Sequence, residues 1–94
     1  VDDKNVNVIC MLAQLLIAEE KLDQAISLLQ AAIEEANEEA ELWRCVGDAM
    51  SAKEDWANAK TFYEEALRLD ASLQPAIDGL AKIGETKDTE AAVH

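Results

Sequence analysis

The chain has 94 residues, with 20 acidic and 8 basic side chains and a formal net charge of −12 at pH 7. A chain of this length forms one small domain. The charge argues against binding to DNA, RNA or anionic membranes, which all require a basic surface, and no apolar run approaches the ~20 residues that cross a membrane.

Apolar residues recur at helical spacing in successive segments along the chain. In the second segment, for example, Leu22, Ala25 and Leu29 mark a stripe with the helical period, and no segment alternates with the period of two that marks a strand. We therefore predict an all-α fold of five helices, with 1–5 and 87–94 as frayed termini. The predicted helices cover residues 6–18, 22–35, 40–52, 56–69 and 74–86.

The sequence repeats with a period of 34 residues. Shifting the chain by one period places residues of similar size and polarity on one another: Ile9 on Trp43, Leu12 on Val46, Ala13 on Gly47, Leu16 on Met50, Ala25 on Ala59, Leu29 on Tyr63 and Ala32 on Ala66. A second shift continues the pattern, with Trp43 on Ile77, Val46 on Leu80 and Gly47 on Ala81. Such a period indicates helical hairpins that stack on one another and share a core.

The second unit resembles a tetratricopeptide repeat (TPR), a family whose motif places large and small residues at fixed positions on two helices: here Trp43, Val46, Gly47, Met50, Ala59, Tyr63 and Ala66. The first unit matches through Ile9, Leu12, Ala13, Leu16, Ala25, Leu29 and Ala32. The resemblance implies an α-solenoid of antiparallel helix hairpins: a single TPR-like domain over 6–86, with repeats 6–39 and 40–73 and a capping helix 74–86. The chain departs from the family at Asn37 and Ala71, where Pro often follows the second helix.

The last predicted helix has a polar outer face, which the end of a helical array requires for solubility. The chain also begins at Val1 without a Met. We therefore expect these repeats to be the C-terminal part of a longer array, in a fragment or processed product. The closing repeats are also similar to those of scaffold subunits of the anaphase-promoting complex, a cell-cycle ubiquitin ligase, through Gly47, Asp48 and Gly79.

The first predicted helix is apolar on nearly every side, since only Asn7 and Gln14 interrupt it. A helix of this kind is normally buried on all sides. Yet the face that packs against the second helix cannot hold all of Val6, Val8, Leu15 and Ile17. Two hypotheses remain open: a preceding repeat covers this surface, or the surface mediates self-association. Membrane insertion is not expected, because the segment spans only ~20 Å.

The residues needed for catalysis are lacking in the sequence. The only histidine is His94 at the terminus, so no Ser–His or Cys–His pair is expected. Cys10 and Cys45 fit no disulfide framework and no metal motif. We interpret them as buried thiols of an intracellular protein, cytoplasmic or nuclear. We expect no enzyme activity, no cofactor and no metal, and we place Trp56, Phe62 and Tyr63 in the core.

An acidic run joins the second predicted helix to the third and comprises Glu34, Glu35, Glu38, Glu39 and Glu41. It lacks the ligand spacing of an EF-hand, so we interpret it as a solvated surface that attracts a basic partner. Residues 1–41 contain two lysines against ten acidic residues, so most of the negative charge lies in this half of the chain.

The resemblance implies a concave groove along the first helix of each hairpin, which holds an extended peptide or a partner helix. Carried over by position, its partner-binding residues are Asn7, Cys10, Gln14, Glu41, Arg44, Asp48, Asp78 and Lys82, with Met11 and Cys45 beside them. Family members that clamp a C-terminal carboxylate use Lys, Asn and Arg at five positions where this chain has Cys10, Gln14, Cys45, Pro75 and Gly79. Chaperone-tail binding of that kind is therefore not expected.

Taken together, these features predict a non-catalytic protein–protein interaction or scaffold module. Its partner is expected to be a protein or peptide with basic and apolar residues. The alternative is a structural role, in which the helix over 6–18 terminates an array or forms a homo-oligomer. In that case Val8, Leu15 and Ile17 are the expected assembly face.

Overall fold

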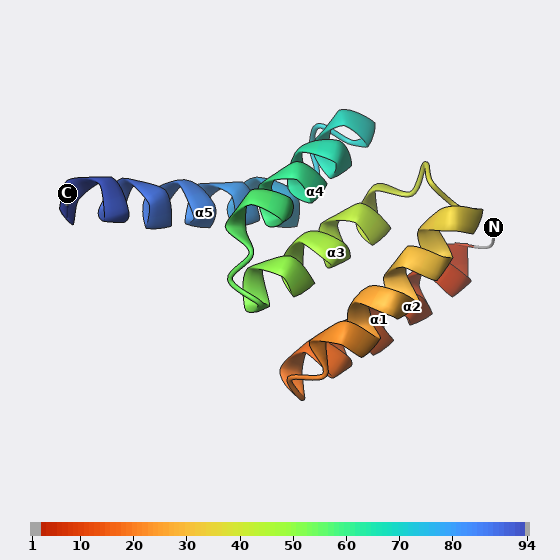
Figure 1. Ribbon diagram of the computed structural model, residues 1–94. Coiled ribbons are helices and arrows are strands. Elements are labelled where there is room, and N and C mark those ends of the chain that lie inside the picture. Colours follow the sequence, from red (N-terminus) through yellow and green to blue (C-terminus); the bar gives the residue numbers. More distant parts are fainter. Residues whose placement is uncertain (1–2, 94) are drawn as a thin grey trace.

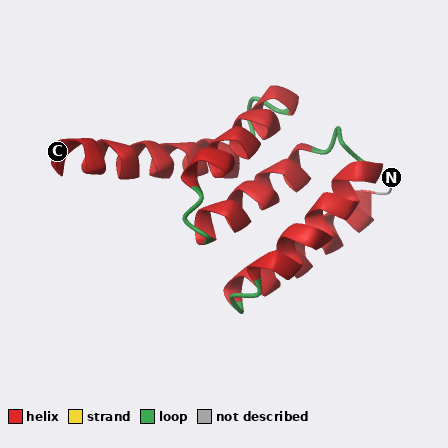
Figure 2. Cartoon of the chain, viewed as in Figure 1, coloured by secondary structure: helices red, strands yellow, loops and turns green. Residues whose placement is uncertain are grey.

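The computed structural model describes the backbone of residues 3–93 and the side chains of residues 6–84, and the described chain consists of helices joined by short turns (Figures 1 and 2). The helices are α1 (Asp3–Ala18), α2 (Leu22–Glu35), α3 (Ala40–Ala52), α4 (Trp56–Leu69) and α5 (Gln74–Val93). The predicted all-α fold is confirmed, and the bounds of α2, α3 and α4 are those predicted. None of the helices in the described range is long and apolar enough to cross a membrane.

The two outer helices are longer than predicted. Helix α1 begins at Asp3, and α5 continues to Val93 although fraying was expected from residue 87. An acidic residue in a first turn suits the helix dipole, and residues 87–93 contain neither Gly nor Pro to end a helix. The other residues of the predicted frayed termini, 1–2 and His94, lie outside the described residues.

The same turn closes both helical hairpins. Glu20 and Glu54, which are one 34-residue period apart, both have left-handed backbone conformations, with φ of 64° and 62°. In the first turn the Lys21 N–H donates to the Leu16 carbonyl oxygen over 2.8 Å. In the second turn the Asp55 N–H donates to the Met50 carbonyl oxygen over 2.9 Å. These are the hydrogen bonds of a Schellman cap. The repeat seen in the sequence is therefore also a repeat of backbone geometry.

The helices stack so that each new hairpin packs on the one before it. Helix α3 contacts both α1 and α2, and α5 contacts both α3 and α4. As Figure 1 shows, α3 and α4 lie between the α1–α2 hairpin and α5, whose C-terminal half extends beyond the other helices. This arrangement is the predicted one, two repeats followed by a capping helix. It places α1, α3 and α5 in one row and α2 and α4 in the other.

Two clusters of buried side chains form the core. The first joins α1, α2 and α3 through Val6, Cys10, Ala13, Leu29, Ala32, Leu42, Cys45 and Val46. The second joins α4 and α5 through Ala59, Tyr63, Ala66, Ala76 and Ile83. In the second cluster the Tyr63 ring lies so close to two glycines that a Cβ placed on Gly47 would stand 2.7 Å from it, and one on Gly79 closer still. Glycine at these two positions therefore allows α3 and α5 to approach the ring.

Helix α1 is not buried on all sides, contrary to the expectation from its composition. Its packed side carries Val6, Cys10 and Ala13, which face α2 and α3. The opposite side leaves four apolar residues exposed, which we call the α1 stripe: Val8, Met11, Leu12 and Leu15. Ile17 does not belong to the stripe, because it is half-buried and a nine-residue step in a helix turns it away from Val8. This side of α1 is exposed because no described element of the chain covers it.

Candidate functional site

The eight predicted groove residues lie on α1, α3 and α5 at positions that repeat every 34 residues. One set consists of Cys10, Arg44 and Asp78, and another of Gln14, Asp48 and Lys82. Asn7 and Glu41 form a third set, and Pro75 occupies the equivalent position on α5. Since α1, α3 and α5 form one row of the stack, residues one period apart face the same side of the molecule. The groove residues therefore share one surface.

This surface contains two hollows, which we call the groove. The first, of about 580 Å³, lies between α1 and α3 and is lined by Asn7, Cys10, Met11, Gln14, Glu41 and Arg44. The second, of about 590 Å³, lies between α3 and α5 and is lined by Asp48, Ser51, Trp56, Tyr63, Pro75, Asp78, Gly79, Lys82 and Ile83. All eight predicted partner-binding residues line one of the two, but Cys45, also predicted in the groove, is fully buried and lines neither. Ser51, Trp56, Tyr63 and Ile83 were not predicted there. Spacing alone placed the aromatic residues in the core, and position in the repeat did not indicate Ser51 or Ile83.

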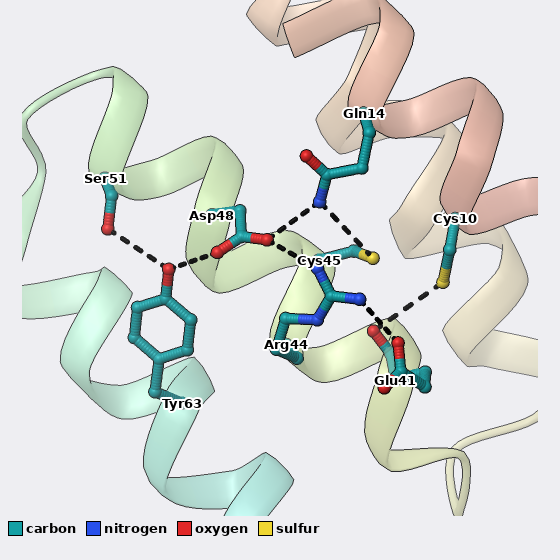
Figure 3. A network of polar contacts seen from close by, with 8 residues as sticks. All are labelled: Cys10, Gln14, Glu41, Arg44, Cys45, Asp48, Ser51 and Tyr63. Atoms are coloured by element: carbon teal, nitrogen blue, oxygen red, sulfur yellow. Dashed lines mark hydrogen bonds and ion pairs between the residues drawn. The ribbon is translucent and has the colours of Figure 1, made fainter. Parts of the chain in front are cut away.

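Asp48 is the centre of a polar network between the two hollows (Figure 3). One of its carboxylate oxygens, Oδ2, accepts hydrogen bonds from Gln14 Nε2 and from Arg44 Nη1, both over 2.8 Å. The other, Oδ1, accepts from the Tyr63 hydroxyl, which also lies 3.5 Å from Ser51 Oγ. The network thus ties α1 and α4 to one carboxylate of α3.

Arg44 is held between two carboxylates of its own helix. Its Nη2 donates to Glu41 Oε2 over 2.5 Å and its Nη1 to Asp48, and only 17% of the Arg44 side chain is exposed. Burial lowers the pKa of the guanidinium, but Cys45, Glu41 and Asp48 outweigh it, so the net shift is upward. Glu41, expected to be part of the solvated acidic run, is instead half-buried and engaged here. The charge of Arg44 is therefore neutralised within the protein.

The two cysteines are free, buried thiols that face each other across α1 and α3. A hydrogen bond with Cys10 and burial raise the pKa of the Cys45 thiol, and the same hydrogen bond lowers the pKa of Cys10. Their sulfurs and a Glu41 carboxylate oxygen lie within 4.8 Å of one another. A metal ion that used these three ligands would have to displace Arg44 from Glu41. It would also be repelled by the positive charge of Arg44. The geometry therefore favours a polar packing contact over a metal site.

The exposed groove residues differ from those engaged in the network. Asn7, Asp78 and Lys82 are exposed, and Asp78 accepts a hydrogen bond from Gln74 Nε2 over 2.9 Å on its own helix. Gln14, Arg44 and Asp48 are instead tied to neighbouring helices or to each other. Substituting the second group would alter the structure as well as the groove surface. Asp78, whose hydrogen bond stays on its own helix, offers a cleaner site for a binding test.

A comparison with known families agrees with this architecture. Residues 2–83 match a family model described as a tetratricopeptide repeat-like domain. No curated protein matches the chain. The match covers both hairpins and most of the described part of the groove.

Proposed function

Because the chain belongs to the tetratricopeptide repeat-like family, we propose that it is a non-catalytic module that binds a protein segment in the groove, as the C-terminal part of a longer array. Membership of this family suggests a role in protein–protein interaction or scaffolding, and domains of the family are generally not enzymes. The observation that carries the proposal is the pair of hollows along α1, α3 and α5. Two hollows side by side suit a segment that spans several residues.

The chemistry of the groove favours a partner with basic and apolar side chains. Of the described charged side chains that line it, Asp48, Asp78 and Glu41 are acidic and Arg44 and Lys82 are basic. Arg44 is paired with Glu41 and Asp48, whereas Asp78 is an exposed carboxylate that a basic partner can reach. Met11, 71% exposed at the edge of the first hollow, offers apolar contact. The formal charge of −12 would strengthen attraction to a basic segment and oppose binding to nucleic acid or anionic lipid.

The location and the assembly of the protein are part of the same proposal. Two buried free thiols fit a reducing compartment, and we place the protein in the cytoplasm or the nucleus. The similarity to scaffold subunits of the anaphase-promoting complex depends on Gly47, Asp48 and Gly79. All three are accounted for by contact with Tyr63, so they argue for the packing of these repeats and not for one particular complex.

The binding test starts from random peptides displayed on phage and selected on the purified chain. We expect the selected peptides to combine Lys or Arg with apolar residues. Titration of one synthetic peptide should show binding weakened about tenfold by Asp78→Lys, because one contact charge is reversed. Glu64→Lys is the matched control: it changes the net charge equally, and Glu64 is exposed on α4 and lines neither hollow.

Two results would contradict groove binding. One is a selection that enriches no peptide. The other is an equal loss of affinity in Asp78→Lys and Glu64→Lys, which would indicate general attraction to an acidic protein.

A second candidate function is structural, in array termination or self-assembly through α1. It is favoured by the exposure of Val8 and Leu15, at 61% and 54%. It does not exclude groove binding, because Asp78 and Lys82 lie on α5, at the other end of the row.

A further inference from the structure

The two cysteines of the chain meet between the two repeats. Cys10 lies on α1 and Cys45 on α3, the first helices of the two hairpins, and both thiols are free. Their sulfurs lie within 4.8 Å of each other (Figure 3). A disulfide bond joins sulfurs at ~2.05 Å, and rotation of the two side chains about their Cα–Cβ bonds changes this separation directly. The fold has therefore paired two thiols that the spacing along the chain did not connect.

The two thiols differ in their access to solvent. Cys10 is 8% exposed and lines the first hollow, between α1 and α3. Cys45 is 0% exposed and lines neither hollow. The first hollow, of about 580 Å³, has room for a small oxidant such as hydrogen peroxide. A reagent that arrives from solvent therefore meets Cys10 before Cys45.

The surroundings also make Cys10 the more reactive thiol, since the thiolate is the form that reacts. A hydrogen bond from Cys45 lowers the pKa of Cys10 and, with the positive charge of Arg44, outweighs burial and the charges of Glu41 and Asp48. The same hydrogen bond, together with burial, raises the pKa of Cys45. Cys45 thus keeps its proton while Cys10 is the thiolate. Geometry and charge assign the same order of reaction, with Cys10 first.

We propose that Cys10 and Cys45 form a reversible oxidation site, in which a peroxide converts the two thiols to a disulfide that joins α1 to α3. In the first step the Cys10 thiolate attacks one oxygen of hydrogen peroxide. An S–O bond forms, the O–O bond breaks and hydroxide leaves, so Cys10 becomes a sulfenic acid. This removes the thiolate charge beside Cys45 that favours its protonated form.

In the second step the Cys45 sulfur attacks the Cys10 sulfur. The S–S bond forms, the S–O bond breaks, and the departing hydroxide takes up the Cys45 proton as water. Overall, two thiols lose two hydrogens and two electrons, and one peroxide becomes two molecules of water. A dithiol reductant reverses the reaction by thiol–disulfide exchange and is itself oxidised to a disulfide.

The disulfide would act on the contact between the two repeats. It would close a loop of 45 − 10 = 35 residues that contains all of α2, and such a loop constrains the unfolded chain. It would also fix α1 against α3 at the wall of the first hollow. The oxidation site goes beyond the proposed function and does not depend on peptide binding.

The test oxidises the folded, fully reduced chain with hydrogen peroxide at low protein concentration. Trypsin cuts after Lys and Arg, so we expect peptides 5–21 and 45–53 to be linked in the mass spectrum and to separate after dithiothreitol. The linked chain should remain a monomer, and its thermal unfolding midpoint should rise by about 10 °C. Before oxidation, iodoacetamide should label Cys10 at least about tenfold faster than Cys45, because Cys45 is covered.

The matched control is Cys45→Ala, which keeps the first step and removes the second. Its Cys10 should form a sulfenic acid that dimedone traps, with no linked peptides and no rise in the unfolding midpoint. A further comparison needs no variant. In urea the unmodified chain should form the disulfide at least about tenfold more slowly than in buffer, because the fold no longer holds the two sulfurs together.

Four results would overturn the proposal. Peroxide carries Cys10 of the unmodified chain to sulfinic acid without linked peptides, or the disulfide joins two chains. The rate of disulfide formation is the same in urea and in buffer, or iodoacetamide labels Cys45 as fast as Cys10 in the folded chain. Each of these would show that the fold does not prepare the two thiols for reaction with each other.

Discussion

At the scale of single residues, Tyr63 links the packing of the second repeat to the groove. Its ring lies against Gly47 of α3 and Gly79 of α5, and its hydroxyl donates to Asp48. The side chain is 2% exposed, so neither contact can be replaced by water without rearrangement. One residue therefore determines both how closely α5 approaches and where the central carboxylate of the groove stands.

The contact with the ring predicts opposite effects for two glycines of α5. Gly79→Ala should lower the free energy of unfolding by about 1–2 kcal/mol, because the new methyl group would overlap the buried ring and this outweighs the gain in helix propensity. Gly84→Ala should raise it by about 0.5–1 kcal/mol, because nothing lies within 4 Å of a Cβ there. Urea unfolding followed by circular dichroism measures both, and shifts of the same sign would contradict the packing described.

The Tyr63 hydroxyl also predicts a response to alkaline pH. Burial, and then the hydrogen bond with Asp48, raise the pKa of Tyr63 above its ordinary value of 10.0. The folded state therefore favours the neutral hydroxyl, and this stabilisation is complete below pH 10 and is lost as the pH rises above it. Tyr63→Phe should lower stability by about 1 kcal/mol near pH 7.

The informative comparison is how much further stability each of the two proteins loses at higher pH. Between about pH 10 and 12 the unmodified protein should lose more stability than Tyr63→Phe, measured as the urea midpoint. Cys45, whose pKa is also raised, titrates in both proteins, so it does not affect the difference. Parallel midpoint curves would show that Tyr63 is not the responsible group.

At the scale of elements, the hairpin turns carry a conformation that their residues do not prefer. Glu20 and Glu54 both occupy the left-handed region, which non-glycine residues enter at a cost of ~1 kcal/mol or more. Their turns nevertheless form, because each is held between two helices that pack against each other. The tertiary contacts of the hairpin outweigh the local preference.

A residue at position 54 that adopts the left-handed conformation without cost should stabilise the second hairpin. Glu54→Gly is expected to raise the free energy of unfolding by about 0.5–1 kcal/mol, because glycine adopts the left-handed conformation freely. Glu38→Gly, in the turn between α2 and α3, is the matched control, since Glu38 is exposed and does not have a positive φ. It should give no gain. Thermal unfolding of both variants decides the matter, and a gain in Glu38→Gly alone would refute the explanation.

At the scale of the whole molecule, the groove and the α1 stripe are neighbouring surfaces with different chemistry. The groove is polar and is lined by both acidic and basic side chains, whereas the stripe is uncharged. They adjoin at Met11, which belongs to the stripe and lines the first hollow. A neighbouring hairpin of the proposed array, packed on the stripe, would therefore add a further row to the groove. The proposed binding and the proposed stacking would then act on one continuous surface.

Most of the fold could be predicted from the sequence, because helix bounds and the 34-residue period depend on local patterns. Helices α2, α3 and α4 begin and end where expected. The groove was predicted less completely. Position in the repeat indicated which residues share a surface, but it did not show that Tyr63 reaches Asp48 from α4. That contact depends on the distance between α3 and α4, which Gly47 allows to be short.

The sequence by itself determined that this chain forms stacked helical hairpins of the tetratricopeptide type, because apolar periodicity and the alternation of large and small residues are local properties. Only the tertiary structure decided which polar residues of the groove pair with one another. Gln14 and Asp48 are engaged across helices, Arg44 pairs with two carboxylates of its own helix, and Asp78 is exposed. It also decided which side of α1 is left uncovered. Both depend on how side chains from separate helices meet in space, and spacing along one chain does not specify those distances.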